Sequence, residues 1–178
     1  LQEKRSHTYR DLLDLFDTSV KRFPTRVAMR IERNGRKEQY TFEDVRELTL
    51  RAAGFFAANG IKPGERVILF SNNMPEWGIT YFGILKAGAT AIPIDPASSV
   101  QEIKRFIEAG EAAAVVISPK LMDENSDLSV DLVFGGKEIP IWTFDEIFEM
   151  PSEIEEATRH ALLPPKVLSN AVASLIFT

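Results

Sequence analysis

The sequence has no cysteine among its 178 residues and contains only two histidines, His7 and His160. The lack of cysteine excludes disulfide bonds, thiolate metal sites and cysteine nucleophiles. Neither histidine has an evident acid–base partner nearby, so the sequence does not indicate imidazole chemistry. An acidic run through Glu156 has no spacing typical of a metal site, and we interpret it as protein surface.

The chain also lacks a net positive charge and a long hydrophobic run. Its formal net charge of -5 argues against nucleic acid or an anionic membrane surface as the main partner. The most apolar stretch, Trp77–Ile94, is interrupted by Lys86, Gly88 and Pro93 and lacks the ~20 apolar residues of a transmembrane helix. The opening Leu1–Arg10 is polar and does not resemble a signal peptide. We therefore expect a cytoplasmic protein with no transmembrane segment.

The overall composition is that of an ordinary globular protein. Hydrophobic residues make up 44% of the chain and charged residues 26%, and both values are typical of soluble domains. A chain of 178 residues can form one domain with a sizeable core, or one part of a larger domain.

Three charge-free segments in the middle of the chain alternate with helical patterns. Strands are predicted at Val67–Phe70, Ala89–Ile94 and Ala113–Ile117. One helix is predicted at Trp77–Ala87, and a second helix from Ser98-Ser99 to a stop at Gly110. Charge-free strands separated by single helices indicate right-handed βαβ units in a parallel sheet. The predicted fold class is therefore α/β, with a mainly parallel sheet and helices on both of its faces.

The helix predicted at Trp77–Ala87 has recognisable ends. Asn73 is expected to cap its start, with Glu76 three residues later. Gly88 follows its end and is expected to hold a positive φ, since glycine adopts the left-handed conformation without a Cβ penalty. Two glycines inside the helix are expected to let neighbouring elements approach closely: Gly78 and Gly83. Three aromatic residues are assigned to packing rather than to a ligand cage: Trp77, Tyr81 and Phe82.

Residues 1–60 are predicted to form a helix, a β-hairpin and a second helix. Thr8 is expected to cap the first helix, whose apolar stripe stops before Pro24. An Asn34-Gly35 turn joins Val27–Glu32 to Lys37–Tyr40 in the hairpin. The second helix is predicted to begin at Thr41, which forms a near-capping box with Asp44, and to end at Gly60.

The pattern weakens after Ser118. The polar stretch Met122–Ser129 is expected to form a loop. Strands are predicted at Val130–Phe134 and Ile139–Trp142 around Gly135-Gly136, a turn that lacks the spacing of a dinucleotide fingerprint. Two capping boxes, Thr143-x-x-Glu146 and Ser152-x-x-Glu155, predict short helices. The apolar run Asn170–Thr178 predicts a final buried strand.

Three motifs, in the right order, resemble one enzyme superfamily. Leu85–Asp95 reads Leu-Lys-Ala-Gly-Ala-Thr-Ala-Ile-Pro-Ile-Asp, which resembles a core motif of the adenylate-forming, or AMP-binding, enzymes. That superfamily includes acyl-CoA synthetases, peptide-synthetase adenylation domains and luciferases. Tyr40–Val45 is similar to the superfamily's Thr-Tyr/Phe-x-Glu-Leu stretch, with Asp44-Val45 in place of Glu-Leu. Gly64–Leu69 is similar to its Gly-Asp-x-Val-x-Ile segment.

The end of the chain resembles the approach to the superfamily's phosphate-binding loop. In these enzymes an apolar strand ending in Tyr/Phe-Thr runs into Ser-Gly-Thr-Thr-Gly-x-Pro-Lys-Gly, whose N–H groups and hydroxyls hold the ATP phosphates. The resemblance implies that Thr178 begins this loop and is the nucleotide-binding residue of the chain. It implies no catalytic residue and no metal ligand in residues 1–178, because the family's catalytic groups follow the loop.

The resemblance covers nearly the whole chain and implies an incomplete AMP-binding domain. Residues 1–60 would be its opening helix–hairpin–helix part, 61–118 its βαβ core, and 119–178 a weaker α/β part with the final core strand. The parent protein is expected to use ATP, Mg2+ and CoA to activate a carboxylic acid as acyl-AMP and to transfer the acyl group to CoA. The 178-residue chain alone is expected to bind none of these and to be inactive.

The resemblance favours some substrates over others. Peptide-synthetase adenylation domains usually carry Tyr-Pro after Pro-Ile-Asp-Pro, whereas this chain has Ala97-Ser98-Ser99, which favours acyl-CoA or aryl-CoA ligases. A fatty acid is the first expectation and an aromatic acid the second. An amino-acid adenylation domain and a non-catalytic scaffold domain stay open. No nucleic-acid partner is expected, and a homo-oligomer or peripheral membrane association of the parent is compatible with the sequence.

Overall fold

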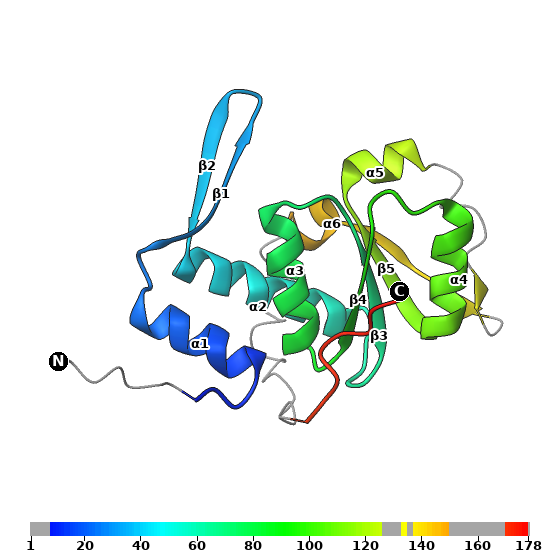
Figure 1. The fold of residues 1–178 in the computed structure, drawn as a ribbon, viewed down its shortest axis with the longest axis horizontal. Coiled ribbons are helices and arrows are strands. Elements are labelled where there is room, and N and C mark those ends of the chain that lie inside the picture. The colour runs from blue at the N-terminus through cyan, green and yellow to red at the C-terminus, as the bar shows by residue number, and fades with distance from the viewer. Residues whose placement is uncertain (1–7, 126–132, 135–136, 150–169, 178) are drawn as a thin grey trace.

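In a computed structural model of the chain, the structure describes residues 8–125, 133–134, 137–149 and 170–177. Figure 1 shows a central sheet with helices on both sides and a β-hairpin that projects from the body. Residues 1–60 supply the hairpin and the helices next to it, and the sheet follows.

The central sheet has four strands and is wholly parallel. Its strands are β3 (Arg66–Phe70), β4 (Thr90–Ile94), β5 (Ala112–Ile117) and β8 (Ile141–Thr143), in the spatial order β4-β3-β5-β8. Val67 lies opposite Ala91 of β4 and Ala114 of β5, and all pairings are parallel. The α/β class and the parallel arrangement of the three predicted strands are therefore confirmed.

Helices cover both faces of this sheet, as predicted. One face is covered by α2 (Phe42–Ala58), α3 (Pro75–Lys86) and α6 (Phe144–Phe148). The other face is covered by α4 (Val100–Gly110) and α5 (Pro119–Glu124). The crossover from β3 to β4 uses α3 and that from β4 to β5 uses α4, so consecutive crossovers lie on opposite faces.

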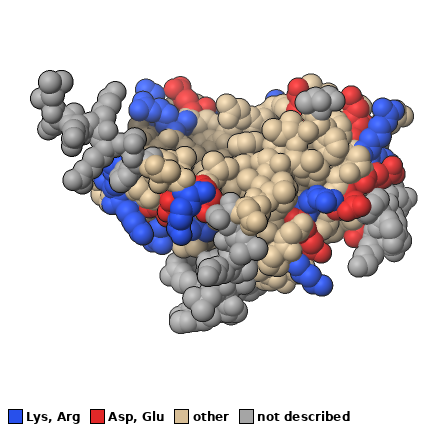
Figure 2. Space-filling view, turned by 60° about the horizontal axis from the view of Figure 1, so that its bottom comes forward, with Lys and Arg blue, Asp and Glu red and all other residues tan. Residues whose placement is uncertain are grey.

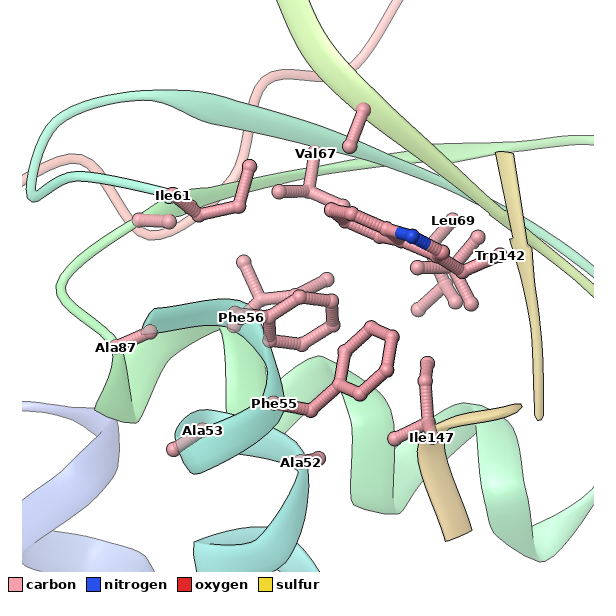
Figure 3. Close-up of a cluster of buried hydrophobic side chains, with 14 of the residues drawn as sticks. Ala52, Ala53, Phe55, Phe56, Ile61, Val67, Leu69, Ala87, Trp142 and Ile147 are labelled. Carbon is pink, nitrogen blue, oxygen red and sulfur yellow. The ribbon is translucent and has the colours of Figure 1, made fainter. Parts of the chain in front are cut away.

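The side chains of β3 alternate between two apolar cores. Val67 and Leu69 face the α2 side, whereas Ile68 and Phe70 face the α4 side, and all four are fully buried. Figure 3 shows the core on the α2 side, where the rings of Phe55 and Phe56 point from α2 toward Trp142 of β8. The Phe55 and Trp142 rings meet edge to face with centroids 5.1 Å apart. Burial on both faces explains why the strands carry no charge.

The N-terminal part contains α1 (Leu12–Arg22) and the hairpin strands β1 (Val27–Arg33) and β2 (Arg36–Thr41). The hairpin turn has positive φ at both central residues, 52° at Asn34 and 71° at Gly35, as in a type I′ turn. The predicted cap of α1 at Thr8 is wrong. Asp11 caps the helix instead, because its carboxylate accepts the N–H of Asp14 at 2.8 Å.

Of the other predicted helix caps, those at Thr41, Ser99 and Thr143 are present and the one at Asn73 is not. Complete capping boxes form at Thr41–Asp44, Ser99–Glu102 and Thr143–Glu146. Bonds from the Thr41 hydroxyl and N–H hold the pKa of the Asp44 carboxyl below its usual value. Asn73 does not cap α3, since Met74 is the N-cap and makes no side-chain bond. Pro75 explains this, because proline fits the first helical position and keeps the preceding residue extended.

The helix ends at Gly110, as predicted, but Gly110 does not hold the left-handed position. Gly110 is the last residue of α4, and the left-handed position belongs to Glu111, with a φ of 47°. A Cβ on Gly110 would lie 2.6 Å from Cδ1 of Ile92 in β4. A side chain at this position would therefore displace the Ile92 side chain, and the next residue adopts the left-handed conformation.

The segment after Ser118 departs from expectation at its start. Part of the predicted loop Met122–Ser129 is helical, because α5 extends to Glu124 after a proline in its first turn. The predicted strand at Ile139–Trp142 is β8, shifted to Ile141–Thr143. A short antiparallel pair joins β6 (Val133–Phe134) to β7 (Lys137–Glu138). The other calls in this part lie outside the described residues: 130–132, Gly135-Gly136, Ser152-x-x-Glu155, Glu156 and His160, as does His7 near the N-terminus.

The end of α3 leads to a prediction about Gly88. Its φ is 79°, its N–H bonds to the carbonyl of Leu85, and the N–H of Ala89 bonds to that of Ile84. Because a β-branched residue is poorly tolerated at positive φ, Gly88→Val should lower the free energy of unfolding by about 1–3 kcal/mol. Gly88→Asn should cost less, since Asn accepts the left-handed conformation. Equal urea-unfolding midpoints for Gly88→Val and the unaltered chain would contradict this explanation.

The contact between α2 and α3 gives a second prediction. A Cβ on Gly83 would lie only 2.6 Å from the Cβ of Ala52, so the predicted close approach at Gly83 is present. Gly83→Ala should therefore destabilise the chain by about 1–3 kcal/mol through overpacking. The exchange Ala52→Gly/Gly83→Ala should recover part of the loss, because it returns one methyl group to the contact. Thermal melts of the three chains test this, and a double variant no more stable than Gly83→Ala would refute it.

Candidate functional site

The last described segment, residues 170–177, runs alongside β4. The N–H of Ala91 donates to the carbonyl of Ala173 at 3.0 Å, and the N–H of Leu175 donates to the carbonyl of Ala91 at 2.9 Å. These bonds form an isolated parallel bridge between Ala91 and Ser174. The segment therefore continues the sheet beyond β4 and points in the same direction as the other strands.

The predicted buried strand at Asn170–Thr178 is only partly correct. Pairing is confined to the bridge, and Val172 and Ile176 are 62% and 68% exposed. The segment is at the edge of the sheet, so among the described residues only β4 lies beside it as a strand. Apolar composition alone could not distinguish this edge position from a central one.

Aromatic and aliphatic packing holds the segment on the α4 side. Leu175 and Phe177 pack against the core formed by α4 and the sheet. The Phe177 ring stacks on Phe106 of α4 with centroids 5.0 Å apart. The Phe177 ring also lies 3.6 Å from the position that a Cβ of Gly110 would take. The bare glycine backbone thus makes room for both the sheet and the final segment.

Two hydroxyl groups hold the same segment on the α3 side. The Tyr81 hydroxyl and Ser174 Oγ are 2.7 Å apart, and Thr90 Oγ1 donates to the carbonyl of Val172 at 2.8 Å. The Trp77 ring stacks on Tyr81 with centroids 5.5 Å apart, so Tyr81 is held in position along its helix. Sequence analysis assigned Tyr81 to packing alone and missed this bond. The available signal was a polar group in a mostly apolar helix, and Thr80 in the same helix carries a hydroxyl as well.

The direction of the segment shows which edge of the sheet Phe177 approaches. Thr178 lies outside the described residues, and Phe177 immediately precedes it. A chain parallel to β4 at this point leads to the edge where the parallel strands have their carboxyl ends. Open α/β sheets bind ligands at that edge, next to the point where the strand order reverses. Here the order reverses between β3 and β5, whose connections leave in opposite directions.

The residues that follow the strands at this edge are short and polar. Ser71 Oγ donates to the carbonyl of Asn72, and Asp95 accepts the N–H of Ala97 at 2.8 Å. Ser118 is 2% exposed, and its Oγ has no hydrogen-bond partner among the described residues. Residues 71–74, 95–99 and 118–119 include no Lys or Arg.

This set of groups does not make a complete site for ATP and Mg2+. Phosphates need cations or several directed N–H groups, and the described carboxyl edge offers hydroxyls, amides and one carboxylate. Within the described ranges, no three His, Cys, Asp or Glu residues are grouped as metal ligands. The described residues at this edge therefore lack the cations and the carboxylate cluster that such a site needs.

None of the helices in the described part of the chain is long and apolar enough to cross a membrane.

A parallel α/β sheet whose last segment leads to its carboxyl edge defines a ligand-binding α/β domain. Comparison with known proteins identifies the family. The family model described as AMP-binding enzyme matches residues 16–178, so the chain belongs to the AMP-binding enzymes. The resemblance found in the sequence motifs is thereby confirmed.

Individual relatives differ in what they make. The chain is 34% identical over 103 residues to crotonobetaine/carnitine–CoA ligase of Proteus mirabilis, covering 53% of this chain and 20% of that protein. It is 28% identical over 130 residues to nonribosomal peptide synthetase 5 of Gibberella zeae, covering 73% of this chain and 1% of that protein. A solved fatty acyl-adenylate ligase of L. pneumophila has the same fold, with a TM-score of 0.72 and 21% identity over 93% of this chain and 27% of that chain. The chain thus spans a fifth or less of the length of these curated relatives.

The anchoring of the final segment predicts an effect of removing one hydroxyl. Tyr81→Phe deletes the bond to Ser174, whose net contribution is about 0.5–1.5 kcal/mol. The Leu175 amide should then exchange with solvent deuterium about two- to tenfold faster, because local opening becomes easier. Tyr40→Phe is the control, since it removes a comparable hydroxyl bond to Glu38 in the hairpin. Equal exchange of the Leu175 amide in the two variants would show that Tyr81 does not hold the segment.

Proposed function

We propose that the chain is the N-terminal part of an ATP-dependent acyl-CoA synthetase. The observation that carries the proposal is the parallel course of residues 173–177 along β4. On this proposal the chain would continue from Phe177 at the carboxyl edge, and the hydroxyl and N–H of Thr178 would begin the phosphate-binding loop. The βαβ core of residues 61–118 serves as the support for that loop, and residues 1–60 cover one side of the support.

The whole protein would join a carboxylic acid to AMP with release of pyrophosphate, and would then pass the acyl group to CoA. The CoA ligase among the relatives supports the CoA-dependent second step. So do Ala97-Ser98-Ser99, which replace the Tyr-Pro pair usual in amino-acid adenylation domains. Ser99 is the N-cap of α4, and the Asp95 carboxylate accepts the N–H of Ala97. A fatty acid is the first substrate class we propose, and an aromatic acid the second.

Amino-acid activation is the second candidate function. The match to the peptide synthetase is longer than that to the CoA ligase, covering 73% rather than 53% of the chain. The two functions share the adenylation step and differ in the acceptor, which is a CoA thiol in the first case. A product assay with CoA present and absent therefore separates them.

The proposal predicts different behaviour of short and long forms of the protein. The 178-residue chain should show no saturable ATP binding by calorimetry at about millimolar nucleotide, because its carboxyl edge lacks cations. A form that continues past Thr178 through the phosphate loop and the rest of the domain should form AMP and acyl-CoA from ATP, Mg2+, CoA and a fatty acid. Saturable ATP binding by the short form would place the nucleotide site elsewhere. Inactivity of the long form with acyl, aryl and amino acids would favour a scaffold domain.

A further inference from the structure

One ion pair fastens the β-hairpin to the helix that follows β3. Nη2 of Arg33, the last residue of β1, lies 2.7 Å and 2.5 Å from the two carboxylate oxygens of Glu76, in the first turn of α3. The two residues are 43 positions apart in sequence. The Glu76 side chain is only 15% exposed, and the Arg33 side chain is 33% exposed. A carboxylate removed from water to this degree depends on its cationic partner, and Arg33 is that partner.

Arg33 differs from the other basic residues of the hairpin. Three of them are exposed and lie more than 4.0 Å from every carboxylate in the described part of the chain: Arg30, Arg36 and Lys37. Nη1 of Arg33 also lies 3.6 Å from Oε2 of Glu38 in β2. The hydrogen bond to Glu76 raises the pKa of Arg33 above its usual value. One guanidinium group thus connects β1, β2 and α3.

Apolar contacts hold the hairpin against the same part of α3. A Cβ on Gly78 would lie 3.0 Å from Cε of Met29 in β1, so the predicted close approach at Gly78 is present. Met29 and Tyr40 pack against the small core that includes Ile79 of α3. Met29 and Arg33 are four residues apart in a strand and therefore share one face of it. That face of the hairpin is the one turned toward α3.

The start of α3 follows a loop at the carboxyl edge of the sheet. Residues 71–74 form this loop between β3 and α3. Ser71 is 4% exposed and follows β3 at the point where the strand order reverses. Asn72 and Asn73 are exposed, and their amide groups can contact a ligand at this edge. Figure 1 shows the hairpin extending past the start of α3 on this side of the molecule.

The first turn of α3 lacks the side-chain cap that α1, α2 and α4 have. Its N-cap is Met74, which makes no side-chain bond, and Pro75 has no N–H. Met74 and Trp77 pack against the core on the α2 side, and the N–H of Trp77 donates to the carbonyl of Met74 at 3.1 Å. Glu76 lies between these two residues in sequence. Its bond to Arg33 is therefore the polar side-chain contact that holds this turn.

We propose that Arg33 is a positioning residue that acts through Glu76 to hold residues 71–74 in place at the nucleotide edge. The inference rests on the proposed function, which gives this edge its ligand. Without Arg33, the partly buried Glu76 carboxylate would move toward water and shift the turn that follows the loop. Asn72 and Asn73 would then lose their fixed positions. ATP should bind less tightly, while bound substrates react at a similar rate.

Hydrogen exchange in the 178-residue chain tests the positioning without any enzymatic assay. Arg33→Gln should speed exchange of the Trp77 amide, which bonds to the Met74 carbonyl, by about two- to tenfold. The amide of Ile68, in the buried strand β3, should change by less than about twofold. Arg33→Lys, which keeps the positive charge, should restore part of the protection. An unchanged Trp77 rate in Arg33→Gln, or an equal rise at Ile68, overturns the proposal.

A matched control separates the ion pair from the charge of the hairpin. Arg36 lies opposite Arg33 in the hairpin register and is exposed. Arg36→Gln removes the same charge and should leave Trp77 exchange within about twofold of the unaltered chain. The exchanged pair Arg33→Glu/Glu76→Arg should protect Trp77 better than Glu76→Arg alone, although an arginine in the first helical turn is unfavourable. A double variant that exchanges no more slowly than Glu76→Arg contradicts the coupling.

A form that continues past Thr178 tests the consequence for the reaction. Arg33→Gln should raise the KM for ATP by about fivefold or more with kcat within about twofold, and Arg36→Gln should match the unaltered form. Circular dichroism and gel filtration establish that each variant is folded. Normal KM values in Arg33→Gln, with an active unaltered form, overturn this inference alone. An unaltered form that makes no acyl-AMP from any acid instead overturns the proposed function.

Discussion

The complete burial of β3 is the constraint on which the rest of the structure depends. Val67–Phe70 have no exposed surface, because β4 and β5 pair with both edges of the strand and helices cover both its faces. A strand in this position cannot carry an unpaired charge. Its neighbours must present apolar surfaces of matching shape, which α2 and α3 do on one face and α4 on the other. Polar side chains first become numerous where the strands end, and so the carboxyl edge is where chemistry can take place.

The parallel sheet could be predicted from sequence because burial on both faces leaves a local signature. This signature consists of charge-free runs, capping boxes such as Thr41–Asp44, and the helix-ending Gly88. Each of them depends on interactions between residues that are close in sequence. The predicted caps at Thr8 and Asn73 were wrong because nearby residues, Asp11 and Pro75, set the helix starts instead. Gly110 differs, because the group that crowds its position is the side chain of Ile92 in β4. No local rule reveals that contact.

The candidate site follows the same division. The motif Leu85–Asp95 and the apolar end of the chain were sufficient to indicate the family and the place of Thr178. The groups that hold the approach to Thr178 were not predictable, because Tyr81 meets Ser174 across 93 residues of sequence. Tyr81 is one of several aromatic residues on an apolar helix, and only the fold determines which of them reaches the final segment. The edge position of residues 170–177 could not be predicted either, because the exposure of Val172 and Ile176 depends on which described residues lie beside them and not on composition.

The distribution of charge connects the two parts of the molecule. Residues 71–74, 95–99 and 118–119 at the carboxyl edge include no Lys or Arg, so the nucleotide site that we propose there would need cations from other residues. The exposed Lys21 and Arg22 at the end of α1 do not fill that need, because Figure 1 shows α1 and the last described residues on different sides of the molecule. Figure 2 shows Lys and Arg gathered on the left side of the molecule, where Figure 1 places α1. Lys86 lies closer in sequence to the sheet, but Asp17 of α1 binds its Nζ at 2.8 Å. That ion pair fastens α1 to α3 and leaves the cations at the other end of α1 facing outward. The positive charge at α1 therefore lies away from the carboxyl edge, and the buried strands of the sheet are uncharged.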